Sequence, residues 1–300
     1  MQISANGIAM EVEDHGPTSG EPLLLIMGLG MQLVAWPNGL VRQLVQRGFR
    51  VIRFDNRDIG LSQSFDHLGV PNIVVDAMKY SVGLNVKSPY SLADMAADSA
   101  GVLAALGIPS AHVFGVSMGG MVAQHLALRH PSRVKSLTLM MTSSGARHLP
   151  GPSMKVRSAM LGRPAKGGGL QALLDYYVRL YRLIGSPGYP SDESDVRARA
   201  EGWISRSIRP AGNLRQIVAI AADGDRSKLL RELKVPTQVI HGRADALVPV
   251  AAGIDLAKKI PDAQLDLIDG MGHDLPEALW PRFVNGIEAA AERSRTPQPS

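Results

Sequence analysis

The chain has 300 residues, 45% of them hydrophobic, and a formal net charge of +5. This size and composition allow one large α/β domain with a substantial core. It contains no cysteine, which excludes a thiol nucleophile and structural disulfides. No apolar run approaches the roughly 20 residues of a membrane span and no signal-peptide pattern is present, so no membrane association is expected.

Basic residues are concentrated in the middle of the chain. From Arg147 to Lys234 there are 16 Lys or Arg against 8 Asp or Glu. Such an excess can steer an anionic substrate, but solvated helix faces explain it more simply. No basic run is interleaved with aromatic residues, so we expect no nucleic-acid partner. The sequence has no His-Glu-x-x-His motif and no His/Cys cluster, so we expect no metal site.

Strand-like and helix-like segments alternate over the first half of the chain, as βαβ units require. Asn6-Gly7 between apolar flanks predicts a hairpin over Ile3–Met10. The alternation stops near Ser143 and resumes near Val235. The predicted elements are strand 23–27, helix 37–47, strand 49–54, helix 92–106, strand 112–116, helix 118–130, strand 134–141, strand 236–241 and strand 264–268.

A glycine-containing loop, Gly28-Leu29-Gly30-Met31, follows the first buried strand. Its flexibility allows backbone N–H groups to face inward. Gly-x-Gly also occurs in dinucleotide-binding loops, but Leu33 stands where a third glycine is needed, and no suitable acidic residue follows for a ribose. We therefore expect no nucleotide cofactor.

The most informative segment is Val113–Gly120, which carries Gly-x-Ser-x-Gly at Gly115, Ser117 and Gly119. A strand is predicted before the serine and a helix after it. A serine on such a turn is lifted above the sheet edge, and the glycines leave room for a strained backbone. The helix N-terminus presents unpaired N–H groups to an anionic intermediate. We therefore predict that Ser117 is a nucleophile.

Residues 143–234 interrupt the alternation and predict a helical cap inserted over the sheet. One stripe of apolar residues keeps helical spacing within it, and its members are Leu170, Leu173, Leu174, Tyr177, Tyr181 and Ile184. The simpler interpretation is that this stripe packs onto the main domain, and the alternative is that it lines an apolar acyl pocket. The candidate wall residues are Met154, Met160, Tyr176, Tyr177 and Trp203.

A serine nucleophile needs a histidine base, which in this architecture lies near the end of the chain. His273 is the one histidine after residue 241, and it lies in a glycine-rich loop that follows strand 264–268. His125 and His130 fall on the helix after the serine, so we expect them at its surface or its end. His241 ends a strand and is expected to pack there. We predict that His273 is the base.

The acid that orients the base is expected between the serine and the histidine. Asp245 turns out of strand 236–241, 28 residues before His273. Asp223 and Asp225 are alternatives in a polar turn, and Asp269 is an alternative within the histidine's own loop. We favour Asp245, whose charge should be buried and hydrogen-bonded.

From about residue 1 to 290 the chain resembles the α/β-hydrolases. Besides the serine turn, the resemblance rests on Leu24-Leu25-Ile26-Met27-Gly28, Arg53-Phe54-Asp55-Asn56-Arg57-Asp58-Ile59-Gly60-Leu61-Ser62 and His241-Gly242-Arg243-Ala244-Asp245-Ala246-Leu247-Val248-Pro249. The Met-Gly opening of the early loop and Trp36-Pro37 are similar to bacterial serine esterases of the aclacinomycin methylesterase branch. The chain departs from the family at Asp269, where proline is usual, and at Met27, where many members have histidine.

The resemblance implies an α/β-hydrolase fold, with a mostly parallel eight-stranded sheet flanked by helices. The interrupted alternation of elements divides the chain into a core domain of residues 1–142 and 235–292 and a cap of residues 143–234, and the polar residues 293–300 predict a disordered tail. The resemblance also implies that Asp55, Arg57 and Asp58 brace their loop by ion pairs rather than taking part in chemistry.

The resemblance assigns the two donors of an oxyanion hole to the backbone N–H groups of Met118 and Leu29, with Gly28 and Gly30 as alternatives to Leu29. The implied reaction is hydrolysis of carboxylic esters of small to medium acyl chain through an acyl-enzyme, without a cofactor. The same residues can also serve C–C bond, amide, lactone or peracid chemistry, and this fold also includes non-catalytic ligand receptors. A small-molecule ester is the expected partner and a bacterial cytoplasm the expected location, whereas the sequence leaves the oligomeric state open.

Overall fold

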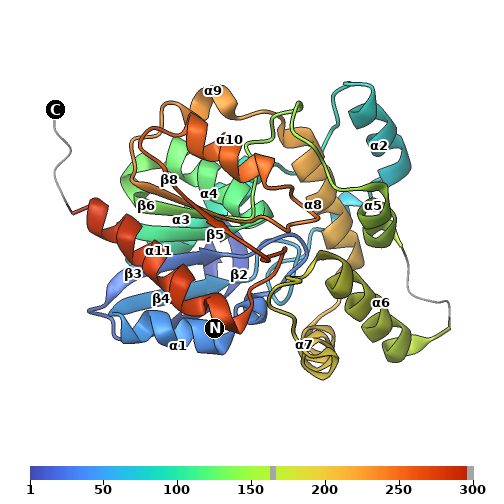
Figure 1. Ribbon diagram of the computed structural model, residues 1–300, viewed down its shortest axis with the longest axis horizontal. Coiled ribbons are helices and arrows are strands. Elements are labelled where there is room, and N and C mark those ends of the chain that lie inside the picture. The colour runs from blue at the N-terminus through green and yellow to red at the C-terminus, as the bar shows by residue number, and fades with distance from the viewer. Residues whose placement is uncertain (163–166, 296–300) are drawn as a thin grey trace.

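A computed structural model of the protein describes residues 1–162 and 167–295. An eight-stranded sheet forms its centre, in the order β1-β2-β4-β3-β5-β6-β7-β8 (Figure 1). The pairs β1–β2 and β2–β4 are antiparallel, and all other neighbours are parallel. The predicted fold class is therefore confirmed. The strands are β1 Gln2–Ala5, β2 Ile8–His15, β3 Glu21–Ile26, β4 Phe49–Phe54, β5 Ala111–Val116, β6 Val134–Met140, β7 Thr237–Gly242 and β8 Gln264–Ile268.

Helices cover both faces of this sheet (Figure 1). α1 and α11 bury their apolar sides on one face, and α3 and α4 bury theirs on the other. The helices of the sheet-containing part are α1 Asn38–Gln46, α2 Ile73–Ser81, α3 Leu92–Ala105, α4 Met118–Arg129, α10 Ala251–Lys259 and α11 Trp280–Arg293. Short 3₁₀ helices are η1 Leu33–Ala35, η2 Asp66–Leu68, η3 Pro131–Arg133 and η4 Glu277–Leu279.

Between β6 and β7 the chain forms five further helices in its described part. These are α5 Met154–Leu161, α6 Gly169–Ile184, α7 Glu193–Arg206, α8 Pro210–Asp223 and α9 Ser227–Leu230. α5, α6 and α7 lie to one side of the sheet, at the right of Figure 1. No helix among residues 1–162 and 167–295 is long and apolar enough to span a membrane.

The N-terminal hairpin forms as predicted. Ala5 faces Ile8 across a two-residue turn. Asn6 and Gly7 have φ angles of 50° and 76°, the positive values that such a hairpin turn needs. At the other end of the chain α11 ends at Arg293, and the last five residues of the expected disordered tail, 296–300, lie outside the described residues.

α2 has no counterpart among the predicted elements. None of its residues is buried, and it stands away from the sheet at the upper right of Figure 1. Its first residues, Ile73-Val74-Val75, are β-branched and favour a strand over a helix. Asn72 nevertheless caps the helix through the Val75 N–H.

Candidate active site

Ser117 occupies a sharp turn where β5 ends and α4 begins. Its φ of 53° and ψ of −123° lie outside the regions that side-chain-bearing residues prefer. Two contacts hold this conformation: the Ser117 N–H donates to the Met140 carbonyl at 3.0 Å, and the Thr142 hydroxyl donates to the Ser117 carbonyl at 2.6 Å. The strained geometry of the predicted nucleophile turn is thus fixed by the last residue of β6 and by Thr142, which follows the strand.

The glycines around Ser117 are required by space. A Cβ atom at Gly119 would lie 2.0 Å from the Ile26 carbonyl oxygen, and one at Gly115 would lie 2.4 Å from the Gly119 carbonyl oxygen. Any side chain at either position would push α4 away from β3 and β5. The motif therefore reflects how closely the helix approaches the strands.

The structure brings Ser117, His273 and Asp245 together at the carboxyl edge of the sheet. His273 Nε2 lies 3.0 Å from Ser117 Oγ, and His273 Nδ1 lies 2.8 Å from Asp245 Oδ2. An ionised aspartate accepts only, so Nδ1 carries the proton and Nε2 is free to accept the serine hydroxyl. This is the arrangement needed to draw a proton from Ser117.

The Asp245 side chain is fully buried and well supplied with donors. While Oδ2 faces the imidazole, Oδ1 accepts the backbone N–H groups of Leu247 at 2.9 Å and Val248 at 2.8 Å. These bonds compensate for the loss of water around the carboxylate and fix its plane. Both carboxylate oxygens are therefore engaged, and Oδ2 is held toward His273.

The three alternative acids are engaged elsewhere. Asp223 bonds to His125 at 2.6 Å, and the Asp225 carboxylate accepts the Ser227 N–H. The Asp269 side chain is 91% exposed and pairs with Arg243. Among the sequence candidates, Asp245 is the one that contacts His273.

His241 supports Asp245 from behind. It is completely buried, its Nε2 donates to the Val248 carbonyl at 2.8 Å, and it lies 3.6 Å from Asp245 Oδ2. Burial lowers the pKa of His241, which favours its neutral form. The packed position expected from the sequence agrees with this environment.

The expected surface position of His125 is wrong. Only 6% of this residue is exposed, because α4 lies between the sheet and α9, and His125 bonds to Asp223 at the end of α8. Burial, together with the charge of Arg226, lowers the pKa of His125 to about 4. His130 does lie at the end of α4, as expected.

The loop that carries His273 is anchored by the end of α6. The His273 N–H donates to the Ile184 carbonyl at 2.7 Å, and the Gly272 N–H donates to Ser186 Oγ at 2.8 Å. Tyr181 and Ser186 both donate their hydroxyls to Asp274. The sequence offered no signal for these contacts, because they join segments about 90 residues apart.

The turn after β3 lies against the nucleophile. A Cβ atom at Gly28 would lie 3.2 Å from Ser117 Cβ. The Gly30 N–H donates to Gln216 Oε1 at 2.9 Å and is thereby occupied. Among the described residues, no acceptor is found for the N–H groups of Leu29 and Met118. Of the three sequence candidates in this turn, Gly30 is thus the least available to a substrate oxygen.

Buried ion pairs hold the segment after β4. Arg57 makes a double hydrogen bond with Asp98 at 2.6 and 2.7 Å, and Asp58 makes another with Arg215 of α8 at the same distances. Asp55 accepts from Leu33 N and Leu61 N and pairs with Arg206 of α7. These contacts confirm the predicted bracing role of the three residues.

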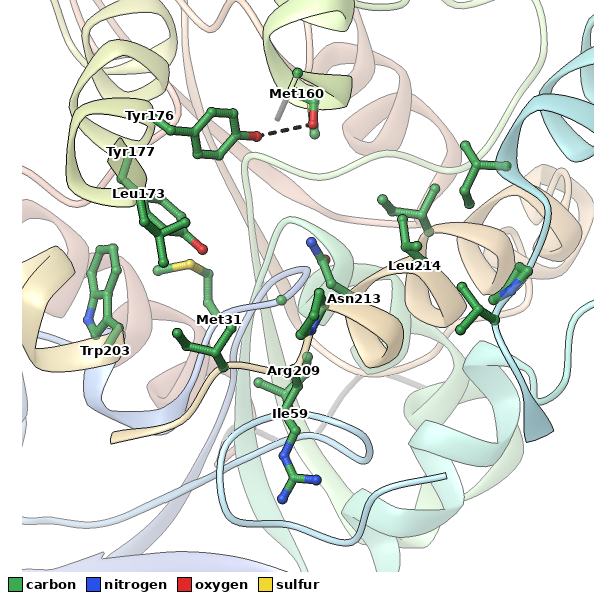
Figure 2. Close-up of a pocket in the computed structure, with 18 of the residues that line it drawn as sticks. Met31, Ile59, Met160, Leu173, Tyr176, Tyr177, Trp203, Arg209, Asn213 and Leu214 are labelled. Atoms are coloured by element: carbon green, nitrogen blue, oxygen red, sulfur yellow. Dashed lines mark hydrogen bonds between the residues drawn. The ribbon is translucent and has the colours of Figure 1, made fainter. Parts of the chain in front are cut away.

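A cavity of about 1340 Å³ opens beside this site. Gly30 and Met31 contribute to its wall, together with residues of α2, α7 and α8 (Figure 2). Among the described residues, the lining does not include Ser117, Asp245 or His273. The cavity reaches the turn after β3, whose Gly28 lies against Ser117.

The sequence candidates for the cavity wall are largely correct. Met160, Tyr176, Tyr177 and Trp203 line the cavity, whereas Met154 is 74% exposed and does not. In Figure 2, Leu173, Tyr177 and Met31 lie together near Trp203.

The apolar stripe of α6 divides between the two interpretations. Leu173 and Tyr177 line the cavity, whereas Leu174 is buried in packing. Leu170 is 45% exposed. The apolar face of α6 therefore contributes both to packing inside the protein and to the wall of the cavity.

Groups of three or more His, Cys, Asp or Glu side chains arranged to hold a metal ion are not found within residues 1–162 and 167–295.

Comparison with known proteins places this geometry in a family. The family model for the α/β hydrolase fold matches residues 21–277. Rhodomycin D methylesterase DauP from Streptomyces sp. (strain C5) is 28% identical over 297 residues, covering 92% of this chain and 93% of that protein. The 2-hydroxymuconate semialdehyde hydrolase of Pseudomonas sp. (strain CF600) is 30% identical over 279 residues, covering 91% and 86%. The predicted resemblance to methylesterases is confirmed.

Solved structures agree on the fold. A meta-cleavage product hydrolase from Pseudomonas fluorescens IP01 has a TM-score of 0.75 at 21% identity, covering 98% of both chains. A thermophilic esterase from Thermogutta terrifontis has a TM-score of 0.72 at 24% identity, covering 99% of both. By its sequence, by its fold and by the family model that spans most of its length, the chain belongs to the α/β hydrolase family.

Proposed function

We propose that the protein is a serine hydrolase of carboxylic esters that works through an acyl-enzyme. The observation that carries this proposal is the unbroken line of hydrogen bonds from Ser117 through His273 to Asp245. The methylesterase names of the relatives support the ester as substrate class. The geometry needs no cofactor for this reaction.

In the first step Ser117 Oγ attacks the ester carbonyl while its proton passes to His273 Nε2. The resulting imidazolium is stabilised by Asp245. His273 then protonates the departing alcohol, which leaves an ester between Ser117 and the acyl group. A water molecule gives its proton to His273 and attacks this ester, and the acid leaves as Ser117 regains its proton.

The negative charge that forms on the carbonyl oxygen requires donors. The N–H groups of Leu29 and Met118 can meet this need because neither has an acceptor among the described residues. Met118 directly follows Ser117, and Leu29 directly follows Gly28, which lies against Ser117. Met118 is also the first residue of α4, so the helix dipole adds to its effect.

The cavity has room for a large part of the substrate, and the methylesterase names of the relatives indicate that the alcohol part is small. Its volume of about 1340 Å³ exceeds the roughly 300–1,000 Å³ of common small-molecule sites. Tyr177 and Trp203 pack edge-to-face on its wall with ring centres 6.4 Å apart. We expect esters with a bulky apolar acid part and a small alcohol to be hydrolysed best, beyond the small to medium acyl chains that the sequence predicts.

Substitution Ser117→Ala tests the proposal. Removal of the nucleophile should lower kcat by at least three orders of magnitude, with substrate binding and melting temperature almost unchanged. The measurement uses p-nitrophenyl butyrate and a set of methyl esters with bulky acids. Hydrolysis by the variant within tenfold of wild type would overturn the assignment, and tight binding by wild type without turnover would identify a receptor instead.

C–C bond hydrolysis is the second candidate. The 30% identity to 2-hydroxymuconate semialdehyde hydrolase over 91% of the chain favours it. Because both reactions can share a serine and a histidine, the substrate decides between them. Wild-type kcat/KM for a methyl ester and for a ring-cleavage dienone, measured side by side, separates the two.

We further propose that residues 143–234 form the cap and that residues 1–142 and 235–292 form the core. α7 and α8 are bound to the core by buried pairs, such as Arg206 with Asp55 and Arg215 with Asp58. This half of the cap should therefore remain fixed when substrate enters. The end of α6 is tied to the His273 loop, so any opening is expected in α5 or in α2 on the opposite wall.

A further inference from the structure

One buried glutamine links the cap segment to the turn that lies against the nucleophile. Gln216 belongs to α8, and its side chain is completely buried. Its Oε1 accepts the Gly30 N–H at 2.9 Å, and its Nε2 donates to the Arg57 carbonyl at 3.0 Å. The two ends of one amide thus join the loops that follow β3 and β4.

The orientation of this amide is fixed. If the oxygen and nitrogen of Gln216 exchanged places, an N–H would face the Gly30 N–H and an oxygen would face the Arg57 carbonyl oxygen. Arg57 cannot shift to relieve this, because its guanidinium is bound to Asp98 by two hydrogen bonds. Gln216 therefore presents its acceptor to Gly30 in one arrangement only.

The turn itself depends on that acceptor. The Met31 N–H donates to the Gly28 carbonyl at 3.3 Å, and Gly30 has a φ of 68° at the third position of the turn. A positive φ there defines the orientation of the peptide group between Leu29 and Gly30. Without Gln216 this group would carry a buried N–H with no partner, which favours rotation of the peptide.

α8 also limits the space around the turn. A Cβ atom at Gly30 would lie 2.6 Å from Asn213 Oδ1. Asn213 and Gln216 are three residues apart, so they lie on the same face of α8. The helix thus contacts Gly30 sterically and through a hydrogen bond, and it leaves the neighbouring Leu29 N–H without an acceptor among the described residues.

We infer that Gln216 is a positioning residue for the oxyanion donor of this enzyme. It holds the turn of residues 28–31 in the conformation that points the Leu29 N–H at the developing negative charge. This inference rests on the proposed function, since it requires an oxyanion. It adds that the cap segment, through α8, supplies part of the preorganisation of the catalytic centre.

Substitution Gln216→Met tests the inference because it keeps length and burial but removes the acceptor. We expect kcat for p-nitrophenyl butyrate to fall about tenfold or more while KM changes less than about threefold, as for a weakened oxyanion donor. A trifluoromethyl ketone forms a tetrahedral oxyanion on the serine, so its Ki should rise by the same factor. The Ki of the matching methyl ketone, which remains a carbonyl, should stay almost constant.

Gln216→Glu and Gln124→Met complete the design. Gln216→Glu still offers an oxygen to Gly30 but loses the N–H that donates to the Arg57 carbonyl. It should therefore recover only part of kcat and of trifluoromethyl ketone affinity, and it carries the test if the methionine variant does not fold. Gln124 is an equally buried glutamine that bonds to Ser143 and Arg226, away from Gly30. Gln124→Met should lower the melting temperature but not kcat.

Three results would overturn the inference. These are a kcat of Gln216→Met within twofold of wild type, an equal loss of kcat in Gln124→Met, or equal weakening of both ketones. Absence of ester turnover in the wild type would instead contradict the proposed function, so the two failures are distinct.

Discussion

Asp245 illustrates how single residues determine the chemistry of this site. Its Oδ1 is occupied by two backbone N–H groups, so only Oδ2 is directed at His273. This asymmetry leaves one imidazole tautomer, with the proton on Nδ1. The carboxylate therefore controls which nitrogen of His273 faces Ser117.

Substitution Asp245→Asn should reverse that tautomer. Oδ1 of the new side chain must still accept from Leu247 and Val248, which turns its NH₂ group toward His273. The imidazole then accepts at Nδ1 and carries its proton on Nε2, where it cannot take one from Ser117. We expect kcat to fall by about 10⁴, as in serine proteases, with an almost unchanged melting temperature. Steady-state kinetics at neutral pH measures this.

Asp269→Asn is the matched control, because Asp269 lies near His273 in sequence but is 91% exposed in its side chain. Its kcat should equal that of wild type. A similar loss in both variants would mean that charge near His273, and not the tautomer, governs the rate.

Ser117, His273 and Asp245 could be predicted from the sequence. The Gly-x-Ser-x-Gly motif indicates the conformation of the serine turn, and the order of the three residues along the chain in this fold indicates where the acid and the histidine lie. Ser117, His273 and Asp245 meet as expected. Gln216 could not be predicted, since nothing in α8 indicates that Gly30 lies beside it. His125 was placed at the surface because an isolated helix pattern does not show that α9 covers α4.

At the level of elements, α6 serves two purposes. Its Leu174 is buried in packing, while Tyr177, on the next turn of the helix, contributes to the cavity wall. Residues at i and i+3 lie on the same face of a helix. The sequence therefore could not show which residues of this face pack against neighbouring side chains and which line the cavity. The pattern predicted the helix, and only the neighbours of each side chain show its role.

Tyr177→Ala and Leu174→Ala should therefore have different effects. Loss of Tyr177 enlarges the cavity, so kcat/KM for a bulky methyl ester should fall at least tenfold while that for p-nitrophenyl acetate changes less than threefold. Loss of Leu174 creates a void in packing and should lower the free energy of unfolding by about 2–5 kcal/mol. Kinetics with both esters and urea unfolding measure the two effects. Equal loss on both esters for Tyr177→Ala would place this residue in the core.

The strands were predicted more accurately than the isolated helix α2. β4 and β8 match the predicted ranges, and the other predicted single strands and helices begin and end within two residues of the observed ones, whereas the second strand of the predicted hairpin, β2, extends to His15 and not Met10. β4 is buried along most of its length, and such strands have apolar sequences that mark their own limits, whereas β8 is partly exposed and is bounded by polar and glycine residues. None of the residues of α2 is buried, so its sequence shows no apolar stripe with helical spacing. Its β-branched residues favour a strand, although the segment is not part of the sheet.

At the scale of the whole molecule, the two ends of the sheet differ. The carboxyl end carries the strained Ser117 turn, whereas the amino end carries a buried histidine at the start of β5. This residue, His112, is 2% exposed, its Nδ1 bonds to Ser136 Oγ at 2.8 Å, and its Nε2 lies 3.4 Å from Glu21. Lys135 and Arg295 also lie close enough to influence it.

Burial lowers the pKa of His112 from 6.5 to about 4, because the attraction of Glu21 only partly offsets the cost of charging the ring inside the protein. Above about pH 6.5 the ring is neutral in both the folded and the unfolded chain, and its contribution to stability is complete. Between about pH 6.5 and pH 4 only the unfolded chain binds a proton there. Stability is therefore lost as the pH falls through this interval.

We expect this histidine to account for about 2 kcal/mol of the decrease in unfolding free energy between about pH 7 and pH 4.5. His112→Asn keeps a polar side chain beside Ser136 but does not titrate, so its stability should decrease less over the same interval. The substitution also removes the ring contact with Phe49, so the variant should be less stable than wild type at pH 7. The informative quantity is therefore the slope of unfolding free energy against pH. Urea unfolding of both proteins at several pH values gives that slope. Identical slopes would show that the pKa of His112 is the same in the folded and the unfolded chain, and acid sensitivity would then have to arise from other buried groups such as His125.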